Sequence, residues 1–216
     1  MSFDPHIKGK ELRMLSKILN FVFLPLRIVC SHELVNKLGL CSLRDERCAY
    51  VMEHCRGCLL DIGCGNNQLV RNYGHDSVGV DVYDFGGSAI IVQDTSKLPF
   101  DDGSFDSVSF VASLNHIPNR REVLAEVHRL LSEHGRVVLT MIPPFIGAIR
   151  HKLAWWDQDQ SERGLKEGEK FGLSHEYIVS LFGNEGFRLV ERKRIICRLN
   201  NLYVFEKMHK EFSKAE

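Results

Sequence analysis

The sequence predicts an α/β fold built on a doubly wound sheet. The first observation is the stretch Cys58 to Asn67, CLLDIGCGNN, in which an apolar run with one acid leads into Gly63 and Gly65. Leu59–Ile62 suits a strand buried on both faces, and the glycines allow a tight turn beneath a ligand. The second observation is length, because 216 residues with 44% hydrophobic content can bury one sizeable core. We therefore expect a single domain over residues 1–216.

The glycine turn does not fit a dinucleotide-binding loop. That loop requires Gly or Ala at the sixth place of G-x-G-x-x-G, where this chain has Gln68, and here the acid Asp61 stands before the first glycine. The pattern indicates the floor of a nucleotide-type pocket, but it disfavours NAD.

Charge and cysteine content limit the partners and the location. Lys plus Arg equals Asp plus Glu at 28 each, so no global field would hold a polyanion and nucleic acid is not expected as a partner. Seven irregularly spaced cysteines and the lack of a signal-peptide pattern favour a reducing, cytoplasmic location. Cys55 and Cys58 form a C-x-x-C beside His54, which would be half of a zinc site. Because Cys58 opens the expected strand, we expect no metal.

Residues 1–57 are expected to form an N-terminal helical cap. Pro25 and Arg27 interrupt the apolar run Ile18–Cys30, which falls short of the ~20 apolar residues that a bilayer span requires. Two helices meeting near Pro25 fit this pattern, and residues 41–57 read as a helix leading into the first strand. An interfacial helix that binds a membrane surface is the alternative to a packed cap.

Residues 58–140 are expected to form the core of the sheet. A short helix over Gln68–Tyr73 leads to a second strand, Ser77–Val82, and a third, Ala89–Gln93. The intervening Tyr83–Ser88 contains two glycines and leaves no room for a crossover helix of several turns. The second crossover helix should therefore be reduced or missing, which would leave one flank of the sheet open to solvent, to the N-terminal segment or to another subunit.

The next elements follow from local patterns. Phe105–Val111 reads as the fourth strand, and Asn119 is expected to cap a helix over Arg120–Leu131 whose apolar stripe faces the sheet. Gly135 then precedes the fifth strand, Arg136–Thr140.

The C-terminal part begins with a long insertion over residues 141–173, apolar in its first half and charged in its second. Residues 174–207 are expected to form a helix over Glu176–Phe182 and a hairpin of two strands, Phe187–Cys197 and Leu202–Glu206.

Five motifs in order resemble those of the class I S-adenosylmethionine-dependent methyltransferases. They are DIGCG at Asp61–Gly65, GVD at Gly79–Asp81, QDTSKLPFDDGSFDSV at Gln93–Val108, LNHI at Leu114–Ile117 and EVHRLLSEHGRVVLT at Glu126–Thr140. The resemblance covers Cys58–Thr140 continuously. It implies a Rossmann-like seven-stranded sheet with an antiparallel last strand, and S-adenosyl-L-methionine as the cofactor.

The resemblance also implies which residues bind the cofactor. The matching positions are Asp61, Gly63, Cys64, Gly65, Asp81, Val82, Asp94, Thr95, Ala112 and Ser113. The glycine turn would cradle the methionine half, the acid after the second strand would accept both ribose hydroxyls, and the acid after the third strand would bind the adenine amino group. Asp61 would serve the cofactor's ammonium group or, equally, order the turn.

Two further positions carry alternatives. His116 is a candidate catalytic residue facing the sulfonium and the acceptor, or a helix-start residue whose ring is satisfied by backbone. Asn67 replaces the family's third glycine. Asparagine tolerates positive φ, so the turn can survive, but its side chain would crowd or contact the ligand.

The insertion would overhang the site, because it starts at the carboxyl end of the fifth strand. Its apolar first half predicts an amphipathic lid, with Phe145, Trp155 and Trp156 as candidate substrate contacts. The alternative is that these residues fill space beside the fifth strand.

We expect methyl transfer to a small, partly apolar acceptor. Two rivals remain, a catalytically idle cofactor-binding subunit and a membrane-peripheral lipid or quinone methyltransferase. The expected partner is a small-molecule acceptor; contact of the N-terminal helices with a membrane surface and a homo-oligomer are both left open.

Overall fold

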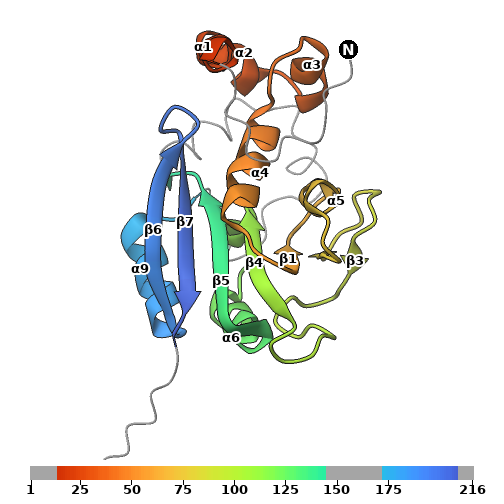
Figure 1. The fold of residues 1–216 in the computed structure, drawn as a ribbon, viewed down its shortest axis with the longest axis vertical. Helices are drawn as coiled ribbons and strands as arrows, with labels where there is room; N and C mark the ends of the chain where they lie inside the picture. Colours follow the sequence, from red (N-terminus) through yellow and green to blue (C-terminus); the bar gives the residue numbers. More distant parts are fainter. Residues whose placement is uncertain (1–13, 145–171, 209–216) are drawn as a thin grey trace, which may run out of the picture.

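The computed structural model describes residues 14–144 and 172–208, and its centre is one seven-stranded sheet (Figure 1). The strand order is β3-β2-β1-β4-β5-β7-β6. The strands are β1 (Leu59–Ile62), β2 (Val78–Asp81), β3 (Ile90–Ile91), β4 (Phe105–Val111), β5 (Leu131–Met141), β6 (Phe187–Ile195) and β7 (Asn200–Lys207). The first five run parallel, and β7 runs antiparallel to both of its neighbours. The doubly wound sheet with an antiparallel last strand is confirmed.

Helices cover both faces of the sheet. On one side lie α4 (Leu43–His54) and α5 (Gln68–Tyr73), and on the other lie α6 (Arg120–Leu130) and α9 (His175–Asn184) (Figure 1). The α6 stripe packs against the sheet as expected, because Val123, Leu124 and Val127 have no exposed surface. The smaller cluster on the opposite face joins Val51 of α4 and Leu69 of α5 to strand residues.

The connection between β2 and β3 contains no helix, as the sequence predicted. Because that helix is missing, apolar side chains at this edge are exposed: Val82 (44%), Tyr83 (39%), Ile90 (43%) and Ile91 (48%). Among the described residues, this flank of the sheet is open to solvent.

The largest differences from the expected strand boundaries concern β5, the β6–β7 connection and β3. β5 begins at Leu131, where α6 ends, and the β4–β5 pairing shifts between Phe105 and Ser107 before becoming regular at Arg136. β6 ends at Ile195 because residues 196–198 all have positive φ, and β7 begins at Asn200. β3 is shorter than expected at Ile90–Ile91.

The expected N-cap position of Asn119 is confirmed, but it is not accompanied by a side-chain cap. Asn119 holds the N-cap position of α6, but its side chain makes no capping hydrogen bond. Its Nδ2 instead donates to Asp94 Oδ1 at 3.2 Å, so the side chain joins α6 to the loop after β3.

The N-terminal segment forms α1 (Met14–Val22), α2 (Leu24–Val29) and α3 (His32–Lys37) at one end of the molecule (Figure 1). Helices α1 and α2 meet next to Pro25, as predicted. Arg27 of α2 is buried and contacts α1, the α3–α4 connection and α4: its guanidinium donates to the carbonyls of Asn20 (2.8 Å) and Cys41 (2.7 Å) and forms an ion pair with Glu46.

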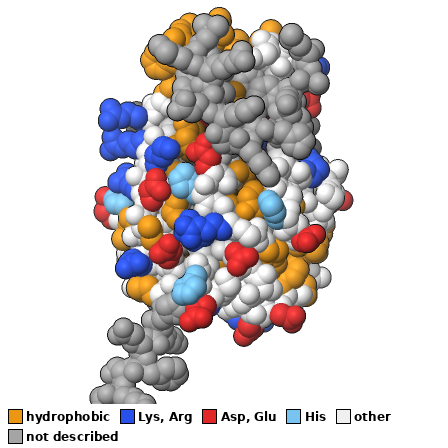
Figure 2. All heavy atoms as spheres, in the orientation of Figure 1, with side chains coloured by type: hydrophobic (Ala, Val, Ile, Leu, Met, Phe, Trp, Pro, Cys, Tyr) orange, Lys and Arg blue, Asp and Glu red, His pale blue; other side chains and the backbone are white. Residues whose placement is uncertain are grey.

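The same segment also leaves apolar side chains exposed, which gather at this end of the molecule (Figure 2). They are Ile18, Leu19, Phe21, Val22, Phe23, Val29, Leu34 and Leu38. No helix in the described part of the chain has the length and apolar character needed to cross a membrane.

Candidate active site

The candidate site lies at the carboxyl ends of β1, β2 and β4. The strand order reverses between β1 and β4, which pair side by side. In open α/β sheets, ligands bind outside the carboxyl ends of the strands at such a reversal. The loops after these strands carry most of the site residues expected from the sequence.

The glycine loop after β1 turns tightly and approaches its neighbours closely. Gly63 and Gly65 have φ of +73° and +56°, and the N–H groups of Gly63 and Cys64 donate to the carbonyl of Val80 at 2.9 and 3.2 Å. A Cβ on Gly63 would lie 2.5 Å from Ser113 Cβ, whereas one on Gly65 would meet nothing within 4 Å. The loop thus leaves open space above Gly65, where a ligand can approach the backbone.

Asp81 joins the glycine loop to the loop after β2. One carboxylate oxygen accepts the N–H of Gly65 at 2.8 Å, and the other accepts the N–H of Tyr83 at 3.1 Å. Each carboxylate oxygen has a second lone pair, so Asp81 keeps the capacity to accept two ribose hydroxyls. The neighbouring Val82, expected beside the ribose, is exposed.

Asp61 is buried at the end of β1, with 1% of its surface exposed. Its Oδ1 accepts a hydrogen bond of 2.6 Å from the Ser109 hydroxyl on β4. Burial raises the pKa of Asp61 to about 7; the Ser109 bond opposes this rise and the nearby Asp81 adds to it. The Ser109 hydroxyl ties Asp61 to β4, and both roles considered for Asp61 remain predictions.

The loop after β4 is held from three sides. Ala112 has φ of +56°, and its N–H donates to Thr140 Oγ1 on β5 at 3.1 Å. The Ser113 hydroxyl donates to the carbonyl of Ile62 at 2.6 Å, which ties this loop to the end of β1. Arg120 of α6 donates to the carbonyls of Leu114 (3.0 Å) and Asn115 (2.8 Å).

His116 belongs to the short 3-10 helix η1 (Leu114–His116) in this loop. Its main-chain N–H donates to the carbonyl of Ser113 at 2.9 Å, and its side chain is half-buried. The arrangement places His116 in the loop that borders the cofactor turn, and both roles considered for it remain predictions.

Asp94 and Thr95 lie in the loop after β3. Asp94 accepts the Ser96 N–H and hydroxyl, both at 2.8 Å, as well as the Asn119 amide. These hydrogen bonds, led by the Ser96 N–H, lower the pKa of Asp94. Thr95 is buried, so the two residues expected at the adenine lie in different environments.

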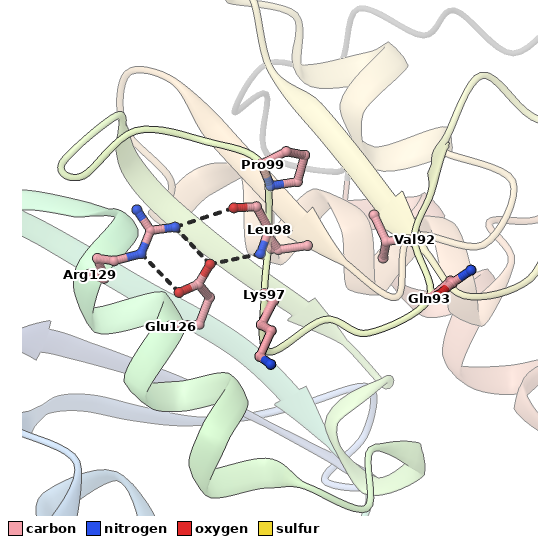
Figure 3. Close-up of a pocket in the computed structure, with 7 residues that line it drawn as sticks. All are labelled: Val92, Gln93, Lys97, Leu98, Pro99, Glu126 and Arg129. Atoms are coloured by element: carbon pink, nitrogen blue, oxygen red, sulfur yellow. Dashed lines mark hydrogen bonds and ion pairs between the residues drawn. The ribbon is translucent and has the colours of Figure 1, made fainter.

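The same loop borders a surface hollow of about 590 Å³, shown in Figure 3. Glu126 of α6 accepts the N–H of Leu98 at 2.8 Å, and Arg129 donates to Glu126 and to the carbonyl of Phe100 at 2.9 Å. None of the cofactor-binding residues expected from the sequence lines the hollow. Its polar groups fix the loop to α6 rather than converge on a ligand.

Asn67 adopts φ of +60°, as its tolerance of left-handed backbone allows. The side chain is 3% exposed and points away from open solvent, with Nδ2 donating to the carbonyl and hydroxyl oxygens of Ser88 at 3.1 and 3.3 Å. A Cβ on Gly79 would lie 2.0 Å from Asn67 Oδ1. In the described residues, the side chain therefore contacts β2 and the β2–β3 loop.

The cysteines remain free thiols, and the described residues hold no group of three or more His, Cys, Asp or Glu side chains suited to a metal ion. Burial raises the pKa of Cys41 and of Cys48 to about 12, and it also raises the pKa of Cys55 and Cys64. These thiols are accordingly protonated near neutral pH.

Several contacts in the site were not foreseen from the sequence. Ser109, Thr140, Arg120 and Ser88 each hold an expected site residue or its loop in place. Their partners lie far along the chain or in loops without a regular pattern, so no local signal marks them. The expected substrate contacts Phe145, Trp155 and Trp156 lie outside the described residues.

Comparisons with known proteins agree with this geometry. A methyltransferase-domain family model matches residues 60–139. A demethylmenaquinone methyltransferase of Chlamydia caviae is 21% identical over 187 residues, which are 70% of this chain and 79% of that protein. Two other curated relatives match over 36% and 30% of their own length, so the chain spans about a third of those proteins.

Solved structures show the same fold. An S-adenosylmethionine-dependent methyltransferase from Thermotoga maritima aligns with a TM-score of 0.59 at 14% identity, covering 91% of this chain and 100% of that one. The Burkholderia thailandensis 1,6-didemethyltoxoflavin-N1-methyltransferase, solved with S-adenosylhomocysteine, aligns with a TM-score of 0.57 at 15% identity, covering 93% and 92%.

The residues of the site fit S-adenosylmethionine. The open space above Gly65 would admit the ligand, and Asp81 retains acceptor capacity beside it. The family match over residues 60–139, the fold and this fit together support a methyltransferase domain that resembles the class I S-adenosylmethionine-dependent type.

Proposed function

We propose that the protein transfers a methyl group from S-adenosylmethionine to a small, partly apolar acceptor in the cytoplasm. The observation that carries this proposal is the double contact of Asp81, which accepts one N–H from the glycine loop and one from the loop after β2. The carboxylate is thereby oriented before any ligand binds, beside the open space above Gly65.

When bound, S-adenosylmethionine supplies a methyl group already activated by the sulfonium. Alignment and exclusion of water can then carry much of the rate, and a base is required only for a poorly ionised acceptor. Gly63 and Gly65 would let the backbone approach the methionine half, Asp81 would hold the ribose, and Asp94 with Thr95 would hold the adenine. Ala112 and Ser113 close the site from the side of β4.

His116 is our candidate for holding or moving the acceptor's proton. It follows Ser113 by three residues, and the hydroxyl of Ser113 is bonded to the end of β1. We assign the contacts with the acceptor itself to Phe145, Trp155 and Trp156, on the basis of the apolar first half of the insertion.

The test is a metabolite-library screen with methyl-labelled S-adenosylmethionine, in which the product that gains the label identifies the acceptor. The Asp81→Ala variant is the matched control and should give no labelled product. If the wild-type protein binds the cofactor but labels no acceptor class, the idle cofactor-binding subunit replaces this proposal.

A membrane-borne lipid or quinone acceptor is a second candidate. It is favoured by the exposed apolar side chains of α1–α3, among them Phe21 (64%) and Val22 (60%). The name of the Chlamydia caviae relative, a demethylmenaquinone methyltransferase, agrees with an apolar acceptor. The segment is then an interfacial surface as well as a cap.

Vesicle flotation separates the two candidates. Under the second candidate, the wild-type protein should float with phosphatidylglycerol-containing vesicles, and the double variant Phe21→Ser/Val22→Ser should not. Val190→Ser is the matched control, because Val190 is 51% exposed on β6, away from these helices. Wild-type protein that stays at the bottom of the gradient would leave only the soluble acceptor.

A further inference from the structure

We propose that Asn67 is a positioning residue that locks the glycine loop to the β2–β3 loop and so holds the cofactor site ready in the ligand-free protein. This inference rests on the proposed function, since it concerns the same site. It assigns a role to the position where the sequence departs from the third glycine of the family motif.

The first support is the set of contacts between the two loops. Asn67 Nδ2 donates to both oxygens of Ser88, and the side chain is almost wholly buried. Next to this link, Gly87 approaches the glycine loop so closely that a Cβ there would lie 2.7 Å from the carbonyl oxygen of Asn66. The two loops therefore form one packed unit rather than two independent turns.

The second support is that the β2–β3 connection contains little regular secondary structure. No helix joins the strands, β3 has only two residues, and the apolar side chains Val82, Ile90 and Ile91 are exposed. Segments with few buried apolar contacts open locally at low free-energy cost. The hydrogen bonds from Asn67 to Ser88 add a restraint that joins this loop to the glycine loop.

The third support is the position of Asp81 between the two loops. Its carboxylate accepts Gly65 N–H from one loop and Tyr83 N–H from the other. If the β2–β3 loop moved, Tyr83 would move with it, and the carboxylate would lose half of the pair that orients it. Asn67 thus acts on the ribose-binding acid through Ser88 and the loop, without touching the ligand.

A glycine at position 67 would keep the backbone turn but remove the hydrogen bonds that join the two loops. The φ of +60° suits glycine at least as well as asparagine, so Asn67→Gly should preserve the turn itself. Asn66→Gly is the matched control, since it makes the same replacement one residue earlier, and Asn66 contributes its carbonyl rather than its side chain to the contact with Gly87.

The first measurement is amide hydrogen exchange in the ligand-free protein. Asn67→Gly should speed exchange of the amides over residues 83–88 by about tenfold, the change expected from losing hydrogen bonds worth about 1.4 kcal/mol in total. Asn66→Gly should leave these amides near their wild-type rates. Ser88→Ala, which removes only the hydroxyl acceptor and keeps the carbonyl acceptor, should give a smaller change in the same direction.

The second measurement separates positioning from simple stability. Asn67→Gly should raise the Kd for S-adenosylhomocysteine and the KM for S-adenosylmethionine by about fivefold to tenfold, with kcat at saturation unchanged. A variant with only a lower melting temperature, or with exchange and affinity equal to those of Asn66→Gly, would overturn the inference.

Failure of this inference is distinguishable from failure of the proposed function. If the wild-type protein does not bind S-adenosylhomocysteine, the proposed function is wrong, and the exchange measurement still decides whether Asn67 locks the two loops. If the wild-type protein binds and exchange does not respond to Asn67→Gly, only the positioning role is wrong.

Discussion

The hydroxyl of Ser109 donates a hydrogen bond of 2.6 Å to Oδ1 of Asp61, and this pair is buried where β1 and β4 lie side by side. The hydrogen bond stabilises the carboxylate form, but the loss of hydration outweighs it, because the pKa of Asp61 is raised to about 7. The candidate site therefore contains an acid that titrates near neutral pH.

The raised pKa predicts a pH-dependent stability. Between the ordinary Asp pKa near 3.9 and a folded pKa of about 7, the folded protein binds more protons at Asp61 than the unfolded chain. The contribution of Asp61 is thus fully present below about pH 4 and is lost as pH rises toward 7, by at most about 1.4 kcal/mol per pH unit. Asp61→Asn should lack this slope in urea unfolding measured from pH 4.5 to 8. Identical slopes for both proteins would show that Asp61 titrates normally.

Asp81→Ala tests the ribose assignment. Two hydrogen bonds to a charged acceptor would be lost, at about 1.5 kcal/mol or more each, so the Kd for S-adenosylhomocysteine should rise at least about 100-fold. The structure adds that Asp81 also accepts Gly65 and Tyr83 N–H groups, so thermal stability should fall modestly while the fold is kept. An unchanged Kd in calorimetry would show that Asp81 does not bind the ribose.

Gly79→Ala tests the packing of Asn67 on β2. The new Cβ would lie 2.0 Å from Asn67 Oδ1 and 2.8 Å from Cys64 Sγ, so the variant should lose about 1–3 kcal/mol of unfolding free energy through overpacking. Combining it with Asn67→Gly should recover most of that loss, because the closest clash disappears. The measurement is a double-mutant cycle in denaturant, and strictly additive losses would contradict the contact.

The core elements were predictable where a strong local pattern coincides with burial. Gln68–Tyr73 and Phe105–Val111 form α5 and β4 with the expected bounds, and the missing crossover helix followed from the short, glycine-containing Tyr83–Ser88. The end of β6 was missed because it depends on the left-handed backbone of residues 196–198, which include Ile196, a residue type that rarely adopts it.

The site was predictable only for residues with a motif. Asp81 and the glycines were identified by resemblance. Ser109 and Thr140 contact site residues only because the sheet pairs β1 with β4 and β4 with β5. A serine or threonine in a strand gives no local sign of which neighbouring strand it will face. Asn119 holds the expected N-cap position, but the sequence did not show that its amide nitrogen donates to Asp94, which is distant in sequence.

Arg120 gives the last prediction, since it holds the loop that carries His116. Its guanidinium is 6% exposed and donates to the carbonyls of Leu114 and Asn115. Lysine lacks the planar guanidinium group whose two nitrogens donate to these carbonyls. Arg120→Lys should therefore leave one buried carbonyl without its hydrogen bond and lower the free energy of unfolding by about 1–3 kcal/mol.

The effect of Arg120→Lys on function should be selective if the loop after β4 faces the acceptor. The cofactor contacts expected after β1 and β2 do not involve Arg120, and Ala112 and Ser113 keep their own hydrogen bonds to Thr140 and Ile62. The Kd for S-adenosylhomocysteine should therefore change less than about threefold, while kcat falls about tenfold or more through misplacement of the loop. Arg121→Lys is the matched control, because Arg121 lies one residue further on α6, is largely exposed and pairs with Glu185 instead. The Kd is measured by calorimetry and kcat by turnover, both on the same preparations. Equal losses of binding and turnover in Arg120→Lys would mean that Arg120 supports the whole fold and not the acceptor side of the site.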